Sequence, residues 1–212
     1  MDVELVQRQI ERAVRDEEVS GRLRRALREH AVRHGRVAGE RELDRAVEFV
    51  VDYVRHVPAL MRHGLESATI AGLEREMGDV LEEAASYWAM EEDIIPDRLG
   101  LLGVLDDAYC SLTLMQSISE RHEVETGRRL FSPDLRSANE AVRKLVGEPL
   151  ASRLDMYVGS RLDADPMLQM VRALTSLDRK GGGLSISAPG PIWGDTSVED
   201  VVRARLGDVG LA

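Results

Sequence analysis

Apolar residues recur every three or four positions along almost the whole of this chain, and this helical period is the strongest constraint on its fold. Residues three and four apart lie on the same face of an α-helix, so each run can bury one stripe against a neighbour. No run shows the sustained alternation of a half-buried strand. Aromatic residues are only 4% of the 212, so aliphatic side chains and methionine must fill the core. The sequence therefore predicts an all-α protein.

Eight helical segments are expected before residue 178. Ser20 is the predicted N-cap of the second, and Pro58 should kink or end the third. Ser132 followed by Pro133 is typical of a helix start. Together the segments predict a compact bundle of about eight helices. Their apolar stripes begin at Val3, Leu23, Leu43, Ile70, Leu105, Leu135, Leu150 and Leu168.

The composition changes near residue 179. The stretch "KGGGLSISAPGPIWGDTS" is rich in Gly, Pro and Ser, which indicates an extended arm. The following "SVEDVVRARLG" predicts a short helix, which is marginal alone and should dock on its own domain or on a neighbouring subunit. We therefore expect an all-α domain over residues 1–178 and an arm with a docking helix over residues 179–212. The predicted interaction residues are Trp193, Val198, Val201 and Val202.

Charge is distributed unevenly along the chain. The net charge of −10 argues against non-specific binding to nucleic acid. Residues 22–36 nevertheless hold six arginines against one glutamate, whereas residues 66–107 are acidic. Such a basic segment can bind anionic lipid or nucleic acid, or the two segments can neutralise each other within the fold or across a dimer. We adopt the second interpretation and expect a protein partner or a second copy, with no nucleic acid.

Several features indicate a cytoplasmic protein. Cys110 is the only cysteine, so no intrachain disulfide can form. The first residues, "MDVELVQRQIERAV", contain no apolar stretch of the kind found in signal peptides. No run approaches the ~18 apolar residues of a membrane span. We therefore expect no transmembrane segment.

The stretch "EEDIIPDRLGLLGVLDDAY", residues 91–109, joins two helical segments and holds four aspartates. Carboxylate oxygens are the ligands that Mg²⁺ and Ca²⁺ prefer, so the turn can be a cation site, and the protein a divalent-metal-dependent hydrolase. The candidate metal ligands are Asp93, Asp97, Asp106 and Asp107.

A structural role for each residue of this turn is the interpretation we prefer, and under it no cofactor is expected. Asp93 can form an Asx turn, and Pro96 should end the preceding helix. Gly100 and Gly103 permit a tight reversal. The other two aspartates fall in the first turn of the next helix, where the macrodipole favours negative charge.

The same region resembles the signature of the YkvA-like family, a bacterial domain of unknown function. The pattern is roughly Y-x5-D-x-I-P-D-x5-G-x-L-D-D-A, and this chain matches it without a gap from Tyr87 to Ala108. Glu91 and Gly100 stand where the family usually has proline. The resemblance implies a helical hairpin over about residues 66–125 and supplies no known reaction.

Two further candidates concern residues that bind metals or act as nucleophiles. His30 and His34 have the i, i+4 spacing with which one helix can bind zinc, with His56 or His63 as a third ligand. We prefer to place them at the edge of a basic amphipathic helix, and Cys110 in the core. The sequence thus predicts a non-enzymatic cytoplasmic interaction or scaffold protein that associates with itself, with the hydrolase as the alternative.

Overall fold

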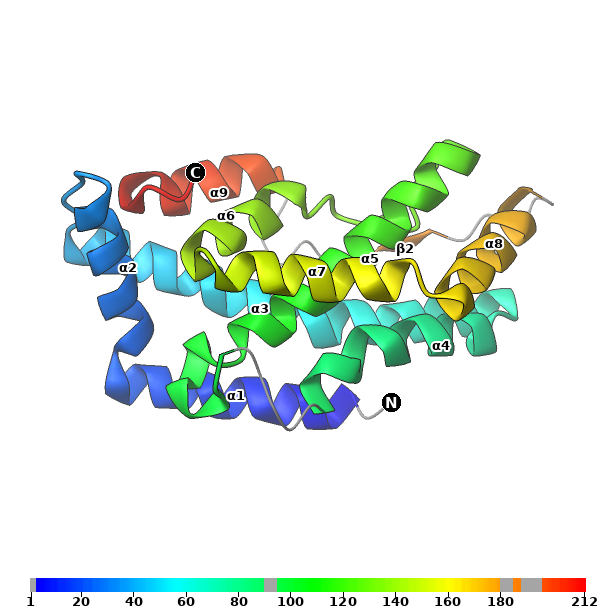
Figure 1. Ribbon diagram of the computed structural model, residues 1–212, viewed down its shortest axis with the longest axis horizontal. Coiled ribbons are helices and arrows are strands. Elements are labelled where there is room, and N and C mark those ends of the chain that lie inside the picture. Colours follow the sequence, from blue (N-terminus) through cyan, green and yellow to red (C-terminus); the bar gives the residue numbers. More distant parts are fainter. Residues whose placement is uncertain (1–2, 90–94, 180–184, 188–195) are drawn as a thin grey trace.

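The computed structural model describes residues 3–89, 95–179, 185–187 and 196–212 (Figure 1). About 81% of the chain is helical, which confirms the all-α prediction. The described residues also form three 3₁₀ helices: η1 (Ser86–Ala89), η2 (Asp97–Leu102) and η3 (Gly207–Val209). The α-helices are α1 (Val3–Ser20), α2 (Arg22–Arg33), α3 (Glu40–Ala71), α4 (Glu74–Ala85), α5 (Leu105–Thr126), α6 (Arg136–Val146), α7 (Leu150–Leu162), α8 (Asp165–Arg179) and α9 (Val198–Leu206).

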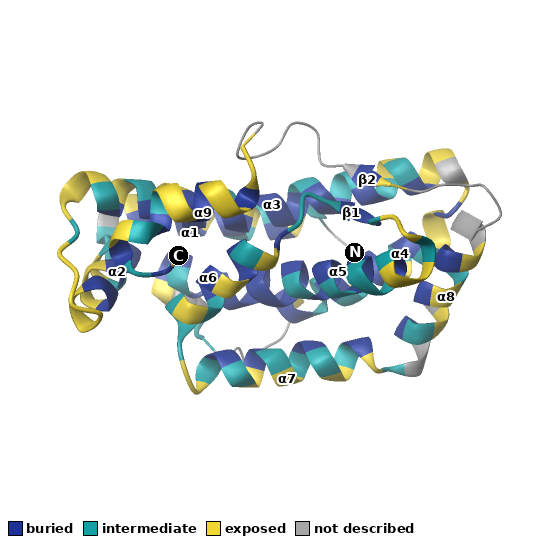
Figure 2. Cartoon of the chain, turned by 90° about the horizontal axis from the view of Figure 1, so that it is seen from above, coloured by how far each residue is buried: buried dark blue, intermediate teal, exposed yellow. Residues whose placement is uncertain are grey.

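The helices form an elongated bundle around α3 and α5 (Figure 1). Helix α3 contacts α1, α2, α4 and α9, whereas α5 contacts α3, α4, α6, α7 and α8. Helix α2 lies at one end of the long axis, and α4 and α8 lie towards the other (Figures 1 and 2). A two-residue parallel ladder joins β1 (Phe131–Ser132) to β2 (Ile186–Ser187). Within the described residues, no helix is both long and apolar enough to cross a membrane.

Helix α3 does not end at Pro58, so the expectation that this proline would stop the helix is wrong, and the alternative of a kink stays a prediction. A proline within a helix removes one backbone hydrogen bond. Here α3 is one continuous helix from Glu40 to Ala71. Val57, Leu60 and Met61 beside the proline are almost completely buried. Packing against several neighbouring helices therefore compensates for the missing bond.

Helix α2 begins with a cap that the sequence did not indicate. Ser20 is the last residue of α1, and α2 follows Gly21, whose φ of 56° favours glycine. The N–H groups of Leu23 and Arg24 donate to the Glu17 carboxylate at 2.9 and 3.1 Å. Glu17 thus reaches back from α1 and satisfies two N–H groups of the first turn of α2. The predicted Ser20 cap is wrong.

Helix α6 starts later than the sequence indicates. Ser132 pairs in β1, and α6 begins only at Arg136. The N–H of Leu135 donates to Oε1 of Gln116 at 2.9 Å, so a side chain of α5 fixes the approach to α6. The predicted helix start at Ser132 is wrong because these contacts come from a segment distant in the sequence.

Helix α9 docks on its own chain, against α3 and α6. Its N-cap is Ser197, whose hydroxyl accepts from the N–H of Asp200 at 3.1 Å. Arg205 pairs with Asp52 of α3 at 2.7 Å. The division into residues 1–178 and 179–212 stays a prediction, but the apolar face of α9 belongs to the same buried cluster as the other helices. That face includes Val198, Val201 and Val202, each at most 8% exposed.

Candidate functional site

The acidic turn is braced by the carboxylate of Asp106. This residue lies in the first turn of α5, as predicted, and is completely buried. Its Oδ2 accepts a hydrogen bond from the Tyr87 hydroxyl at 3.1 Å and another from the Ile95 N–H at 3.0 Å. Tyr87 lies in η1 and Ile95 precedes η2. One carboxylate therefore fastens both of these segments to the start of α5.

A second polar contact fastens α5 to the end of α4. Nε1 of Trp88 donates to the Ser111 hydroxyl at 2.9 Å, and that hydroxyl donates to the Ala84 carbonyl. Both side chains are buried, so each polar atom requires its partner. Tyr87 packs edge-on against Tyr157 of α7, with ring centroids 4.9 Å apart. These contacts make the region a packing element between α4, α5 and α7.

One of the two glycines in the turn has the special conformation that the sequence suggested. Gly100 has a φ of 66°, and a Cβ there would collide with the carboxylate of Asp16 on α1. Gly103 has an ordinary φ of −70°. Glycine is thus required at Gly100, where the turn packs closely on α1, and is not required by the backbone at Gly103.

The four candidate metal ligands are only partly described. Asp93 and the side chain of Asp97 lie outside the described residues, although the backbone of Asp97 starts η2. Asp107 follows Asp106 on α5 and is 3% exposed. Within the described parts of the chain, no group of three His, Cys, Asp or Glu side chains is arranged to hold a metal ion. The cation site stays a prediction.

Cys110 lies one turn after Asp106 and is buried. Burial raises the pKa of its thiol well above the usual range, and the charges of Asp106, Asp107 and Asp155 raise it further. The thiol therefore stays protonated near neutral pH and is not an activated nucleophile. The nearby Tyr109 hydroxyl donates to Asp155 at 2.6 Å, which links α5 to α7.

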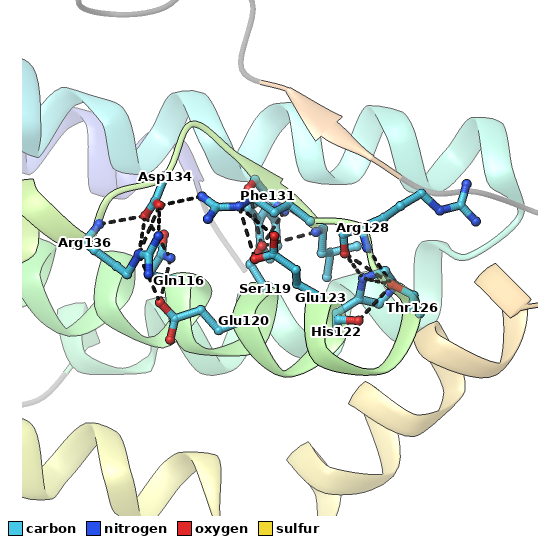
Figure 3. Close-up of polar contacts among 12 residues, drawn as sticks. Gln116, Ser119, Glu120, His122, Glu123, Thr126, Arg128, Phe131, Asp134 and Arg136 are labelled. Carbon is cyan, nitrogen blue, oxygen red and sulfur yellow. Dashed lines mark hydrogen bonds and ion pairs between the residues drawn. The ribbon is translucent and has the colours of Figure 1, made fainter. Parts of the chain in front are cut away.

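A polar network holds the segment after α5 against that helix (Figure 3). The Ser119 hydroxyl accepts from the N–H groups of Leu130 and Phe131, each at 3.1 Å. Nδ1 of His122 lies 2.9 Å from the Arg128 carbonyl oxygen. A catalytic pair would need its serine bonded to its histidine. Ser119 instead bonds to backbone groups, and His122 contacts the Arg128 carbonyl and the Thr126 hydroxyl, so the described network anchors the segment that leads into β1.

The four histidines considered as a candidate zinc site do not gather into one group. His30 and His34 stack with ring centroids 4.2 Å apart, and Nδ1 of His34 lies 2.9 Å from the His30 carbonyl oxygen. His56 is fully buried within α3, and His63 pairs with Glu66. Within the described residues, neither His56 nor His63 forms a metal-binding group with His30 and His34.

Exposed apolar side chains mark one end of the molecule. Val32 is 65% exposed and Val37 is 98% exposed. Val32 lies off the inner stripe of Leu23, Leu27 and Ala31, a signal already present in the sequence. Exposed Arg28 and Arg33 lie beside Val32 together with the exposed Glu29, and Arg36 precedes Val37 in the sequence. We define the basic end as Arg25, Arg28, Val32, Arg33, Arg36 and Val37.

The other end has a similar arrangement of opposite charge. Ile70 was predicted to begin an inner stripe, but it lies at the end of α3 and is 90% exposed. Because α3 extends to Ala71, Ile70 falls on its solvent face. Exposed acidic residues lie near it in sequence, with Arg75 as an opposing charge. We define the acidic end as Glu66, Ile70, Glu74 and Asp79.

Part of the basic segment is neutralised within the fold. Arg24 pairs with Glu40 and Asp44, and Arg28 pairs with Glu40. Arg33 forms no ion pair within the described part of the chain. Exposed ion pairs contribute little free energy and exchange partners readily, so these arginines remain able to meet another acidic surface.

Comparison of the chain with protein-family models, with curated proteins and with solved structures finds no match. The resemblance of the acidic turn to the YkvA-like family stays a prediction.

Proposed function

We propose that this chain is a non-enzymatic cytoplasmic interaction protein that associates with itself, the basic end of one copy binding the acidic end of the next. One observation supports the proposal above the others. Exposed apolar side chains occur at α2 and at the end of α3, towards opposite ends of the long axis, and the exposed charged residues near them in the sequence are mainly basic at the first end and mainly acidic at the second. Figures 1 and 2 show these two ends of the bundle.

The chemistry of the two ends is complementary. Val32 and Val37 on one copy and Ile70 on another would leave water together, and burying such a side chain contributes about 1.5–3 kcal/mol. Arg25 and Arg33 would meet Glu66 and Glu74. Oppositely charged surfaces steer encounters and fix the register of the contact more than they raise its affinity.

A contact between two different surfaces has consequences for assembly. Each copy keeps one free end, so the association continues into a ring or an open filament instead of stopping at a symmetric dimer. The surfaces are small, so the contact should be weak. Its charged part is screened by salt, because the Debye length falls to about 8 Å at physiological ionic strength. Association should therefore rise with protein concentration and fall with added salt.

Charge reversal at each end tests this proposal. We expect the double variant Arg25→Glu with Arg33→Glu to sediment as a monomer at concentrations where the original protein associates. The double variant Glu66→Lys with Glu74→Lys should behave in the same way. The first variant leaves the four arginine positions of the basic end with no net charge, and the second changes the three acidic positions of the acidic end from −3 to +1. In each variant the attraction between the two ends is therefore lost. Analytical ultracentrifugation at low and at high salt measures the effect.

Mixing the two variants provides the decisive comparison. The unaltered acidic end of the first can bind the unaltered basic end of the second, so the mixture should associate although neither variant does alone. Arg153→Glu on the exposed face of α7 is the control and should associate like the original protein. Association of the single variants, or failure of their mixture to associate, would exclude this contact.

A further inference from the structure

A cavity of about 420 Å³ lies between the ends of α2 and α6. His30, Arg33 and His34 line it from α2, and Arg143 and Lys144 line it from α6. Glu148 is the acidic residue of its lining. Its volume falls in the range of small-molecule sites, and no lining side chain is Phe, Tyr or Trp.

The basic residues belong to the last turns of two helices. The C-terminal end of a helix carries partial negative charge, and Arg, Lys or His in the last turn complements it. This preference alone accounts for basic residues at the end of a single helix. Here the last turns of α2 and α6 supply cationic side chains to one shared cavity, a concentration of positive charge that an anionic ligand would compensate.

His30 forms part of the cavity wall as a buried polar group. It is 5% exposed, and its Nε2 has no hydrogen bond of good geometry within the described part of the chain, although the backbone of Gly210, which also lines the cavity, lies near the ring. Buried polar nitrogens are normally paired, so an unpaired one that lines a cavity is a candidate contact for a ligand. The His34 ring stacks against the His30 ring. The contact of His34 Nδ1 with the His30 carbonyl oxygen fixes the orientation of the His34 ring.

The surrounding charges differ in how far they are already paired. Arg143 is bound to Asp155 at 2.8 Å and to Glu148 at 2.7 Å, so its charge is compensated. Among the residues that the structure describes, Lys144 pairs only with the exposed Glu140, a contact of little net energy. Arg33 has no described ion pair. Lys144 and Arg33 are therefore the cations most available to a ligand.

We infer that this cavity binds the phosphate group of a small phosphate monoester, with Lys144 and Arg33 as charged donors and the His30–His34 pair as the wall. A compact dianion suits several convergent N–H donors. The lining holds no Phe, Tyr or Trp, and its two imidazole rings already stack on each other, so the cavity offers a nucleoside base little aromatic surface. A soluble phosphorylated metabolite and a phospholipid headgroup share this chemistry.

Titration calorimetry with inorganic phosphate, at constant ionic strength, tests the inference. The original protein should bind phosphate saturably. Lys144→Gln, and more strongly Lys144→Gln combined with His34→Gln, should raise the Kd by about tenfold or more, as expected for loss of a charged hydrogen bond. Both side chains are exposed, so the variants should keep the original melting temperature in phosphate-free buffer.

Arg153→Gln removes one positive charge outside the cavity and should leave the Kd unchanged. Glycerol 3-phosphate and phosphatidylcholine vesicles containing phosphatidylinositol 4-phosphate then separate the two sources of the phosphate group, because the natural source should bind more tightly than inorganic phosphate. Absence of saturable phosphate binding, or an unchanged Kd in the double variant, would overturn the inference. Lys144 lies outside the basic end, so this result is independent of self-association.

Discussion

Replacing Asp106 with alanine should lower the free energy of unfolding by about 2–4 kcal/mol, because two donors lose a buried, charged acceptor. The Tyr87 hydroxyl and the Ile95 N–H both bind its Oδ2. Water cannot replace this carboxylate easily, since Asp106 is completely buried. Urea unfolding at neutral pH, followed by circular dichroism, measures the change.

Asp106→Asn is the matched control for this prediction. Asparagine keeps one oxygen acceptor in nearly the same volume, so it should cost clearly less than alanine. A loss below about 0.5 kcal/mol for Asp106→Ala would show that the carboxylate does not brace the turn, since that is the level of ordinary surface substitutions.

Acidification from about pH 7 to about pH 4.5 should remove about 2–3 kcal/mol of stability through His56 alone. Burial lowers the pKa of His56 from 6.5 to about 4. The unfolded chain therefore binds more protons than the folded chain between these two values. The contribution of His56 to stability is fully present above its pKa in the unfolded chain. It is lost as the pH falls towards its pKa in the folded protein. Urea unfolding at both pH values measures this loss.

The variant His56→Gln isolates this contribution because it removes the titrating group and keeps a polar side chain of similar size. Its overall stability can differ, but its dependence on pH should be weaker by the predicted amount. His30, whose pKa burial also lowers, is unchanged in both proteins and cancels in the comparison. Equal pH dependence of the two proteins would contradict a buried, neutral His56.

The sequence was sufficient for the class of fold and for most helices, because apolar periodicity is a local signal. It also placed Asp106 correctly in the first turn of α5. It could not show that this carboxylate is fully buried and binds Tyr87 and Ile95, since such contacts depend on how η1 folds back. The general preference of helix N-termini for acidic residues accounts for only part of its role.

The wrong predictions have a shared physical cause. Serine is a favoured N-cap residue, so the sequence predicts that Ser20 and Ser132 begin helices. Instead the side chains of Glu17 and Gln116, which lie on other helices, accept hydrogen bonds from the backbone N–H groups there. Pro58 normally disrupts a helix, but tertiary packing keeps α3 continuous. In each case a contact with another helix outweighs the preference of the single residue. The candidate surfaces could not be predicted for the same reason, because the apolar periodicity assigns Ile70 to a buried stripe.

The central claim is that the acidic turn holds the fold together and that the protein acts through its surface. The measurement that tests it most directly is the melting temperature of the chelator-treated protein with and without millimolar Mg²⁺ or Ca²⁺. Because a ligand that binds only the folded state raises its stability, a metal site would raise the melting temperature. The account predicts that Mg²⁺ or Ca²⁺ changes the melting temperature no more than NaCl of the same ionic strength does. A saturable rise that disappears in Asp97→Asn and Asp107→Asn would contradict it and support the metal-dependent hydrolase.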